Sequence, residues 1–186
     1  MSDSSARDPE FDAHLDAVIV GPRTPTPVVL VEYDDAWPGQ FEQHRARISA
    51  ALLNRARLIE HIGSTSVPGL VAKPIIDVLV AVDDVEDETM YLSALEAAGY
   101  ELRVRETGHR MVRPATHDAN VHIYSVGHPE IDACITFRDR LRADPTDRAI
   151  YEARKRDLAR HDWPDINYYA RAKGEVIATV LSRAQT

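Results

Sequence analysis

The stretch from Glu60 to Asp77 contains the residues whose types and spacing could do chemistry. A turn from Gly63 to Ser66 is followed by Lys73, and Asp77 then stands inside an apolar run. Backbone N–H groups of a glycine- and serine-rich turn can hold phosphate oxygens, and a lysine can neutralise their charge. A carboxylate in a buried strand is costly unless it is paired, hydrogen-bonded or bound to a metal ion. The spacing therefore predicts a phosphate site beside a metal-binding carboxylate.

The turn differs from the P-loop of nucleotide-binding proteins, because no Lys-Ser or Lys-Thr pair follows Gly69. A Gly/Ser turn alone could also be an ordinary tight turn. His61 has two roles that the sequence leaves open: it could bind phosphate, or its ring could hold the turn by hydrogen bonds. The predicted phosphate ligands in this stretch are His61, Gly63, Ser64, Thr65, Ser66 and Lys73.

Asp77 and His122 are the candidate catalytic and metal-binding residues, and the expected metal ion is Mg²⁺ or Mn²⁺. His122 alternates with apolar neighbours on a predicted strand, which favours a role in the core or in the site. Strand alternation places Leu79 on the same face as Asp77, where a two-metal site would have a second carboxylate. A structural hydrogen-bonding role is the alternative for both candidate residues.

Arg138 and Arg142 are four residues apart on a predicted helix and therefore share one face. They could contact a triphosphate. They could equally pair with nearby carboxylates such as Asp139 and Asp144.

Two predicted strands bracket the turn, and a predicted amphipathic helix precedes them. Strands mixed with packed helices indicate an α+β (α/β-like) fold, with a mixed sheet and a helical C-terminal third. The predicted strands cover residues 28–33, 56–62, 75–82, 100–105, 109–113 and 120–126, and the predicted helices cover residues 38–53, 87–98, 130–142, 146–161 and 166–183.

The 186 residues predict one domain over residues 28–186, after a mobile N-terminal tail over residues 1–27. Within the tail, the apolar stretch from Leu15 to Val20 could dock on the body. A net charge of −8 argues against broad nucleic-acid binding. No apolar run approaches the roughly 20 residues of a membrane span, and no signal peptide is visible, so we expect a cytoplasmic protein.

Five segments of the chain carry a resemblance to a known family: Glu60–Asp77, Glu32–Pro38, Asn120–Tyr124, Phe137–Arg142, and Tyr168 with Ala172-Lys173. The long motif around Gly63 is the most specific of them. Together they resemble the GrpB-like family of the polymerase-beta-like nucleotidyltransferase superfamily, over about residues 28–183. The resemblance implies a nucleotidyltransferase-like fold.

The superfamily transfers a nucleoside monophosphate from a nucleoside triphosphate to an acceptor hydroxyl or phosphate. Its pattern is a Gly-Ser turn, two carboxylates separated by one residue, and a third carboxylate on a neighbouring strand. Gly63 and Ser64 match the turn, and Asp77 matches the first carboxylate. Leu79 departs from the second, and the strand expected to supply the third offers His122 instead.

Three hypotheses follow. The first is a metal-dependent nucleotidyltransferase. The second is a protein of the same fold that binds a nucleotide or another phosphorylated small molecule without turnover, which the departures from the pattern favour. The third is a zinc hydrolase that uses His109, His117 and His122, although their spacing fits no standard zinc motif.

Overall fold

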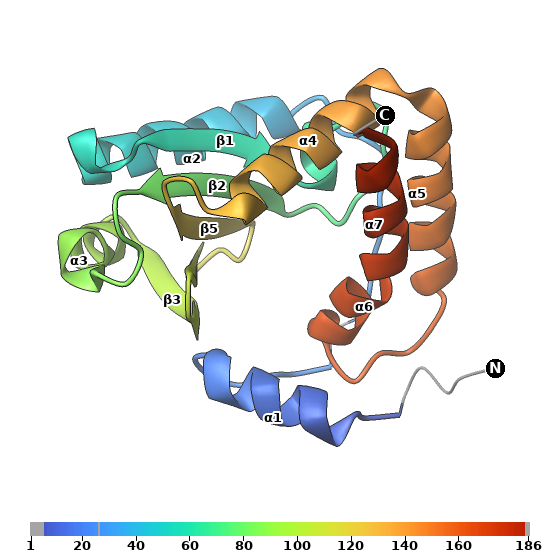
Figure 1. Cartoon of the computed structure of the whole chain (residues 1–186), viewed down its shortest axis with the longest axis horizontal. Coiled ribbons are helices and arrows are strands. Elements are labelled where there is room, and N and C mark those ends of the chain that lie inside the picture. Colours follow the sequence, from blue (N-terminus) through green and yellow to red (C-terminus); the bar gives the residue numbers. More distant parts are fainter. Residues whose placement is uncertain (1–5, 26, 185–186) are drawn as a thin grey trace.

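The computed structural model describes residues 6–25 and 27–184, and its centre is a five-stranded mixed sheet with helices on both faces (Figure 1). β2 and β5 are parallel, and the other neighbouring strands are antiparallel. The predicted α+β fold class is confirmed. Across the sheet the strands are β1 (Leu58–Ile62), β2 (Ile76–Val82), β5 (Ala119–Ser125), β4 (His109–Pro114) and β3 (Tyr100–Glu106).

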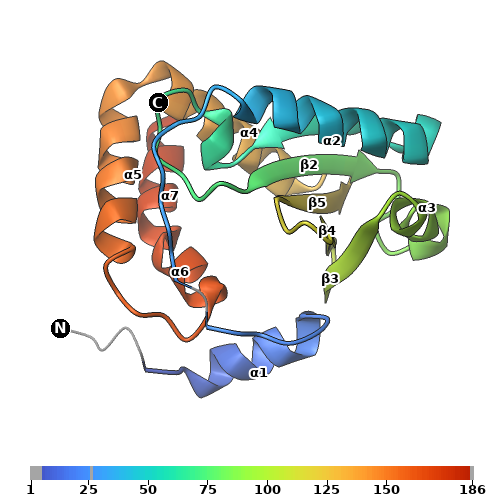
Figure 2. The same ribbon diagram turned by 180° about the vertical axis from the view of Figure 1, so that it is seen from behind.

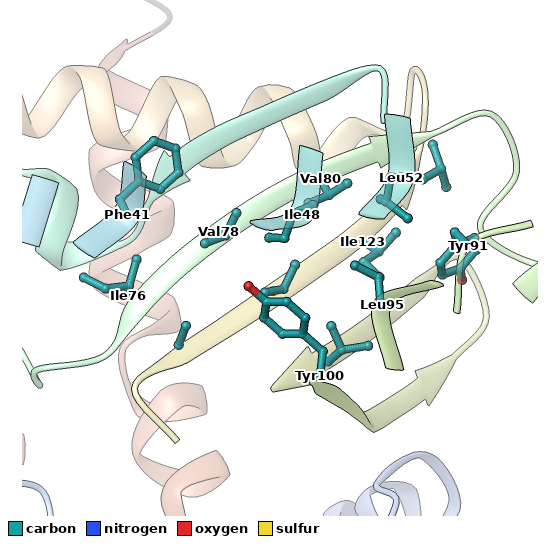
Figure 3. Packing of buried hydrophobic residues seen from close by; sticks show 14 of the residues in the cluster. Phe41, Ile48, Leu52, Ile76, Val78, Val80, Tyr91, Leu95, Tyr100 and Ile123 are labelled. Atoms are coloured by element: carbon teal, nitrogen blue, oxygen red, sulfur yellow. The ribbon is translucent and has the colours of Figure 1, made fainter. Parts of the chain in front are cut away.

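Helices α2 (Trp37–Leu52) and α3 (Leu92–Ala97) cover one face of the sheet and bury the main core (Figure 3). Ile48 of α2 is fully buried in the cluster that contains Val78 and Val80 of β2. Successive side chains of a strand point to opposite faces. Because the even-numbered residues of β2 face this core, Asp77 faces the other side of the sheet.

Helix α4 (Pro129–Ala143) lies on that other side, where Ile131 packs in a cluster with Leu79 and Tyr124. The helical C-terminal third continues with α5 (Pro145–Leu158), α6 (Ile166–Ala172) and α7 (Gly174–Ala184) (Figure 1). α5 begins where the Asp144 side chain accepts hydrogen bonds from two backbone N–H groups of its first turn. A second core joins this region to the segment after β1, with Val67, Leu70, Leu141, Tyr151, Val176 and Val180 buried together.

The N-terminal segment departs from the predicted tail over its described residues 6–25. Helix α1 (Pro9–Val18) runs between β3 and α6, as both views show (Figures 1 and 2). The Asp8 N–H donates to the Tyr168 hydroxyl at 2.9 Å, and the Val20 N–H donates to the Arg103 carbonyl. Leu15 is buried, so the apolar stretch docks on the body. A domain boundary at residue 28 stays a prediction.

Three further elements differ from the sequence prediction. Residues 28–33 form no strand, because their pairing is limited to an isolated bridge between Val31 and Ala72. Residues 87–98 divide into a 3₁₀ turn (Glu88–Met90) and α3. The predicted helix over residues 166–183 divides into α6 and α7 at Lys173. Among the helices described, none has the length and apolar character that crossing a bilayer requires.

Candidate functional site

Gly63 follows β1 directly and lies against Asp77. The two strands place Ile62 opposite Asp77, and Gly63 has φ 69° and ψ −172°, a region that is essentially restricted to glycine. A Cβ atom on Gly63 would overlap the Asp77 carboxylate. The glycine therefore allows the backbone of the turn to approach the carboxylate closely.

The 3₁₀ turn Ser64–Ser66 is held by its own hydroxyl groups and by His61. The Ser66 hydroxyl donates to the Gly63 carbonyl at 2.6 Å. The His61 Nε2 atom lies 3.0 Å from the Thr65 hydroxyl, and its ring stacks on Phe41 with centroids 4.7 Å apart. Burial lowers the pKa of His61 to about 4, so the ring is neutral near pH 7. Of the two roles left open for His61, these contacts favour the one that holds the turn.

Ser64 instead points its hydroxyl at Lys155, a residue that the sequence analysis did not select. The Lys155 ammonium donates to the Ser64 Oγ atom at 3.0 Å and also to the Val71 carbonyl. Only 1% of Lys155 is exposed, and burial followed by the charge of Lys173 lowers its pKa to about 7. The hydrogen of the Ser64 hydroxyl stays available for an acceptor, because the lysine supplies the hydrogen of their shared bond.

Lys73 and Lys173 complete a cluster that contains every lysine of the chain. Their ammonium groups lie 6.0 and 4.7 Å from the ring centroid of Tyr169. Burial, and then the charge of Lys173, lower the pKa of Lys73 to about 8. Within residues 6–25 and 27–184, no lysine forms an ion pair with a carboxylate, so the cluster gathers ammonium groups that lack a direct ionic partner.

Asp77 has polar neighbours on the adjacent strand. The Asn120 amide donates to the Asp77 Oδ1 atom at 3.0 Å, and the His122 Nε2 atom lies 3.8 Å from the same oxygen. Burial alone would raise the pKa of Asp77, but His122, with smaller contributions from Asn120 and Lys73, lowers it overall. The carboxylate is therefore ionised at neutral pH and can accept a cation.

The donors around Asp77 fit one divalent ion better than two. Leu79, on the same face, is fully buried beneath α4, and the described residues contain no group of three metal-binding side chains. Asp77 and His122 could hold Mn²⁺ or Mg²⁺ with water and substrate phosphate as the remaining ligands, as Mg²⁺ sites commonly do. Leu79 stands where a two-metal site has its second carboxylate, and Glu60, opposite Leu79 on β1, is paired with Arg138.

The predicted histidine cluster is brought together only in part. The His109 Nε2 atom lies 3.2 Å from the His122 Nδ1 atom, and the His109 ring stacks on Tyr124. Burial, and then the charge of His122, lower the pKa of His109 to about 3. His117 is exposed in the loop before β5 and joins no such contact. The described residues therefore give the zinc-hydrolase hypothesis no three-ligand site.

Arg138 and Arg142 bind the backbone of the turn region. Arg138 donates to the His61 carbonyl at 3.0 Å and to the Glu60 carboxylate at 2.6 Å. Arg142 donates through Nε and Nη2 to the Ser66 carbonyl, at 2.9 and 2.8 Å. The turn thus has a lysine side, formed by Ser64, Asp77 and the three lysines, and an arginine side, formed by Arg138 and Arg142.

Comparison with known proteins places this architecture in a family. Residues 27–183 match the family described as GrpB protein. A UPF0157 protein of Halalkalibacterium halodurans is 45% identical, over 99% of this chain and 97% of the relative. A UPF0157 protein of Streptomyces coelicolor is 48% identical, over 99% and 97%. The chain therefore belongs to the GrpB family.

A solved structure and a longer relative add to this comparison. The crystal structure of the conserved protein GrpB from Enterococcus faecalis has a TM-score of 0.73 and 32% identity, covering 85% of this chain and 100% of that one. A protein of Mycolicibacterium paratuberculosis named dephospho-CoA kinase is 31% identical over 79% of this chain. The matched segment makes up only 43% of that relative.

Proposed function

We propose that this chain is a nucleotidyltransferase that transfers a nucleoside monophosphate from a nucleoside triphosphate to an acceptor hydroxyl or phosphate. The observation that carries the proposal is the cluster of all three lysines, in which Lys155 donates to Ser64, Lys73 and Lys173 lie over Tyr169, and no lysine forms an ion pair with a carboxylate in the described structure. A buried ammonium without an ion-pair partner, such as that of Lys155, is costly, and a polyanion such as a triphosphate would compensate it and its two half-buried neighbours.

The residues divide into binding and positioning roles. Ser64 donates its hydroxyl hydrogen to a phosphate oxygen, and Lys155 orients that hydroxyl. Lys73 and Lys173 neutralise the charge that grows on the leaving pyrophosphate. Asp77 and His122 hold one divalent ion, which when bound supplies charge stabilisation at the transferred phosphate.

Catalysis in this proposal is mainly positioning. The acceptor oxygen attacks the phosphorus next to the ribose, the bond from that phosphorus to the bridging oxygen breaks, and pyrophosphate leaves. The acceptor loses one proton to solvent or to the product phosphates. Since one relative is named dephospho-CoA kinase, dephospho-CoA belongs among the acceptors to be tested.

A second candidate function is nucleotide binding without turnover, and the specific observation that favours it is Leu79. This side chain is fully buried in the core beneath α4, on the face where a second metal-binding carboxylate is expected. The lysine side would still bind a triphosphate, because none of its contacts depends on a metal ion. Thermal stabilisation by nucleotides that is independent of metal and accompanied by no turnover would establish this alternative.

The test is transfer of radiolabelled nucleoside monophosphate with Mg²⁺ or Mn²⁺, over a panel of triphosphates and acceptors. We expect Asp77→Asn to abolish transfer and to retain triphosphate binding in the presence of EDTA. Asp83→Asn is the matched control, because Asp83 is an exposed carboxylate paired with Arg57 and should not affect turnover. Full turnover by Asp77→Asn would sink the enzymatic assignment.

A further inference from the structure

A separate pocket of about 660 Å³ lies on the arginine side of the turn. Its walls are α2 on one side and α4 with α5 on the other, and β1 contributes Ile59, Glu60 and His61. A volume of this size is typical of a small-molecule site. The lining contains Ser66 but none of Ser64, Asp77 or the lysines, so the pocket is distinct from the proposed triphosphate site.

Positive charge dominates the lining of this pocket. Four arginines and two glutamates face it, and the glutamates are matched by Arg45 and Arg138 through close ion pairs. Arg142 has a carboxylate at 3.6 Å, and Arg148, among the residues that the structure describes, hydrogen-bonds to a single backbone carbonyl at 3.4 Å. These two guanidinium groups are therefore available to an added anion.

Arg142 can bind such an anion without releasing the turn. Its Nε and Nη2 atoms hold the Ser66 carbonyl, and its Nη1 atom lies 3.6 Å from the Asp139 carboxylate, beyond hydrogen-bonding distance. Burial, and then the charge of Arg138, lower the pKa of Arg142, a repulsion that a bound anion would relieve. Guanidinium groups donate in a fixed planar fork that suits phosphate.

The remaining surface of the pocket is apolar and aromatic. Tyr33, Phe41 and Ile59 line it, together with Pro38 and Pro68. An inorganic ion would leave this surface uncovered, whereas a phosphate ester with a flat ring would cover it and gain from its burial.

We propose that this pocket binds a phosphate monoester that carries a flat apolar group, with the phosphate between Arg142 and Arg148. Because Arg142 also holds the Ser66 carbonyl, the ligand steadies the turn whose other side carries Ser64. The pocket is thus a second, regulatory binding site, and its occupancy does not require that the chain be an enzyme.

The experiment uses phenyl phosphate as the probe and isothermal titration calorimetry as the measurement, on the full chain without metal. Binding should weaken about tenfold in Arg148→Gln, since one charge-assisted hydrogen-bonding partner is lost. Arg154→Gln is the control, because Arg154 lies on the same helix, pairs with Asp157 and is not part of the lining. Phenol, which lacks the phosphate, should not bind.

Two further measurements test the location of the bound phosphate and its effect on the turn. Lys173→Met should leave the affinity for phenyl phosphate unchanged. If Lys173→Met abolishes binding and Arg148→Gln does not, the phosphate binds on the lysine side and the assignment to this pocket is wrong. Phenyl phosphate should also slow amide hydrogen exchange at Ser66 and Val67, whose N–H groups make long bonds of 3.3 and 3.2 Å. Unchanged exchange at saturation would refute the coupling between the pocket and the turn.

Discussion

The two sides of the Gly63–Ser66 turn use different cations for different tasks. On the lysine side, Lys155 donates to Ser64, Lys73 and Lys173 lie over the Tyr169 ring, and none of the three forms an ion pair with a carboxylate in the described structure. On the arginine side, planar guanidinium groups bind backbone carbonyls at His61 and Ser66. Arginine suits fixed, multiply bonded contacts, whereas lysine is a compact charge whose pKa shifts readily on burial. The difference indicates that the guanidinium groups hold the turn in place, whereas the lysine side carries the proposed triphosphate site.

The largest expected effect concerns the glycine that both sides depend on. Gly63→Ala should lower the free energy of unfolding by about 3 kcal/mol, from the restricted backbone region and from overlap with Asp77. Urea denaturation measures this change. Gly39→Ala is the control, because a Cβ there meets nothing within 4 Å in α2 and should be neutral or slightly stabilising. Equal stability of the two variants would contradict the close approach of the turn to Asp77.

Lys155→Met tests the lysine side by removing the buried ammonium while keeping a side chain of similar length. Affinity for ATP, measured by calorimetry without metal, should fall at least about tenfold, because a charge-assisted hydrogen bond and the orientation of Ser64 are lost. Arg154→Met, one residue earlier on α5, is the control. In Lys155→Met the Val71 carbonyl also loses its hydrogen-bond donor, which could weaken the fold itself. Lys173→Met removes an ammonium group without this side effect and is therefore the second variant. Unchanged ATP affinity in both variants would remove the basis of the proposed triphosphate site.

The strands around the turn could be predicted from sequence, and the lysine cluster could not. The apolar run that contains Asp77 defines β2 locally, and its alternation assigns Asp77 and Leu79 to one face. The contact between Lys155 and Ser64 joins residues 91 positions apart, and it depends on how α5 packs over the turn. A signal was present, however, because an arginine-rich chain retains lysine at only three places.

The elements that the sequence misplaced have local causes. Residues 28–33 are rich in β-branched side chains, yet within the described parts of the chain Val31 pairs with Ala72 alone, so β propensity by itself forms no strand there. The last predicted helix divides at Lys173, next to Gly174, and this break lies where Lys173 approaches Tyr169. The helical periodicity of the sequence could not show that this break between α6 and α7 lies at the proposed triphosphate site.

On the lysine side, protein stability and ATP affinity should depend on pH in opposite directions. Folding lowers the pKa of Lys155 from 10.5 to about 7 and that of Lys73 to about 8. The unfolded chain therefore binds more protons between pH 7 and pH 10.5, so the contribution of these lysines makes the free energy of unfolding rise with pH in that window. ATP affinity should change the opposite way and fall between pH 7 and pH 9, as the ammonium groups lose their charge. Calorimetry and urea denaturation at both ends of the window measure the two trends, and parallel rather than opposite trends would contradict the assignment of Lys155 and Lys73 to the ATP site.

The smallest expected effect comes from substitutions of Arg142, which test whether its charge or its forked geometry holds the turn. Arg142→Gln should lower the free energy of unfolding by about 1 kcal/mol, because a partly exposed guanidinium loses two hydrogen bonds to the Ser66 carbonyl. Arg142→Lys keeps the charge but offers only one donor direction to that oxygen, so it should restore less than half of the loss. Affinity for ATP should change less than in Lys155→Met, since Arg142 does not line the lysine side. If Arg142→Lys is instead as stable as the unmodified chain in urea denaturation, the positive charge rather than the forked guanidinium contact holds the turn. The proposed difference between arginine and lysine at this turn would then be wrong for the arginine side.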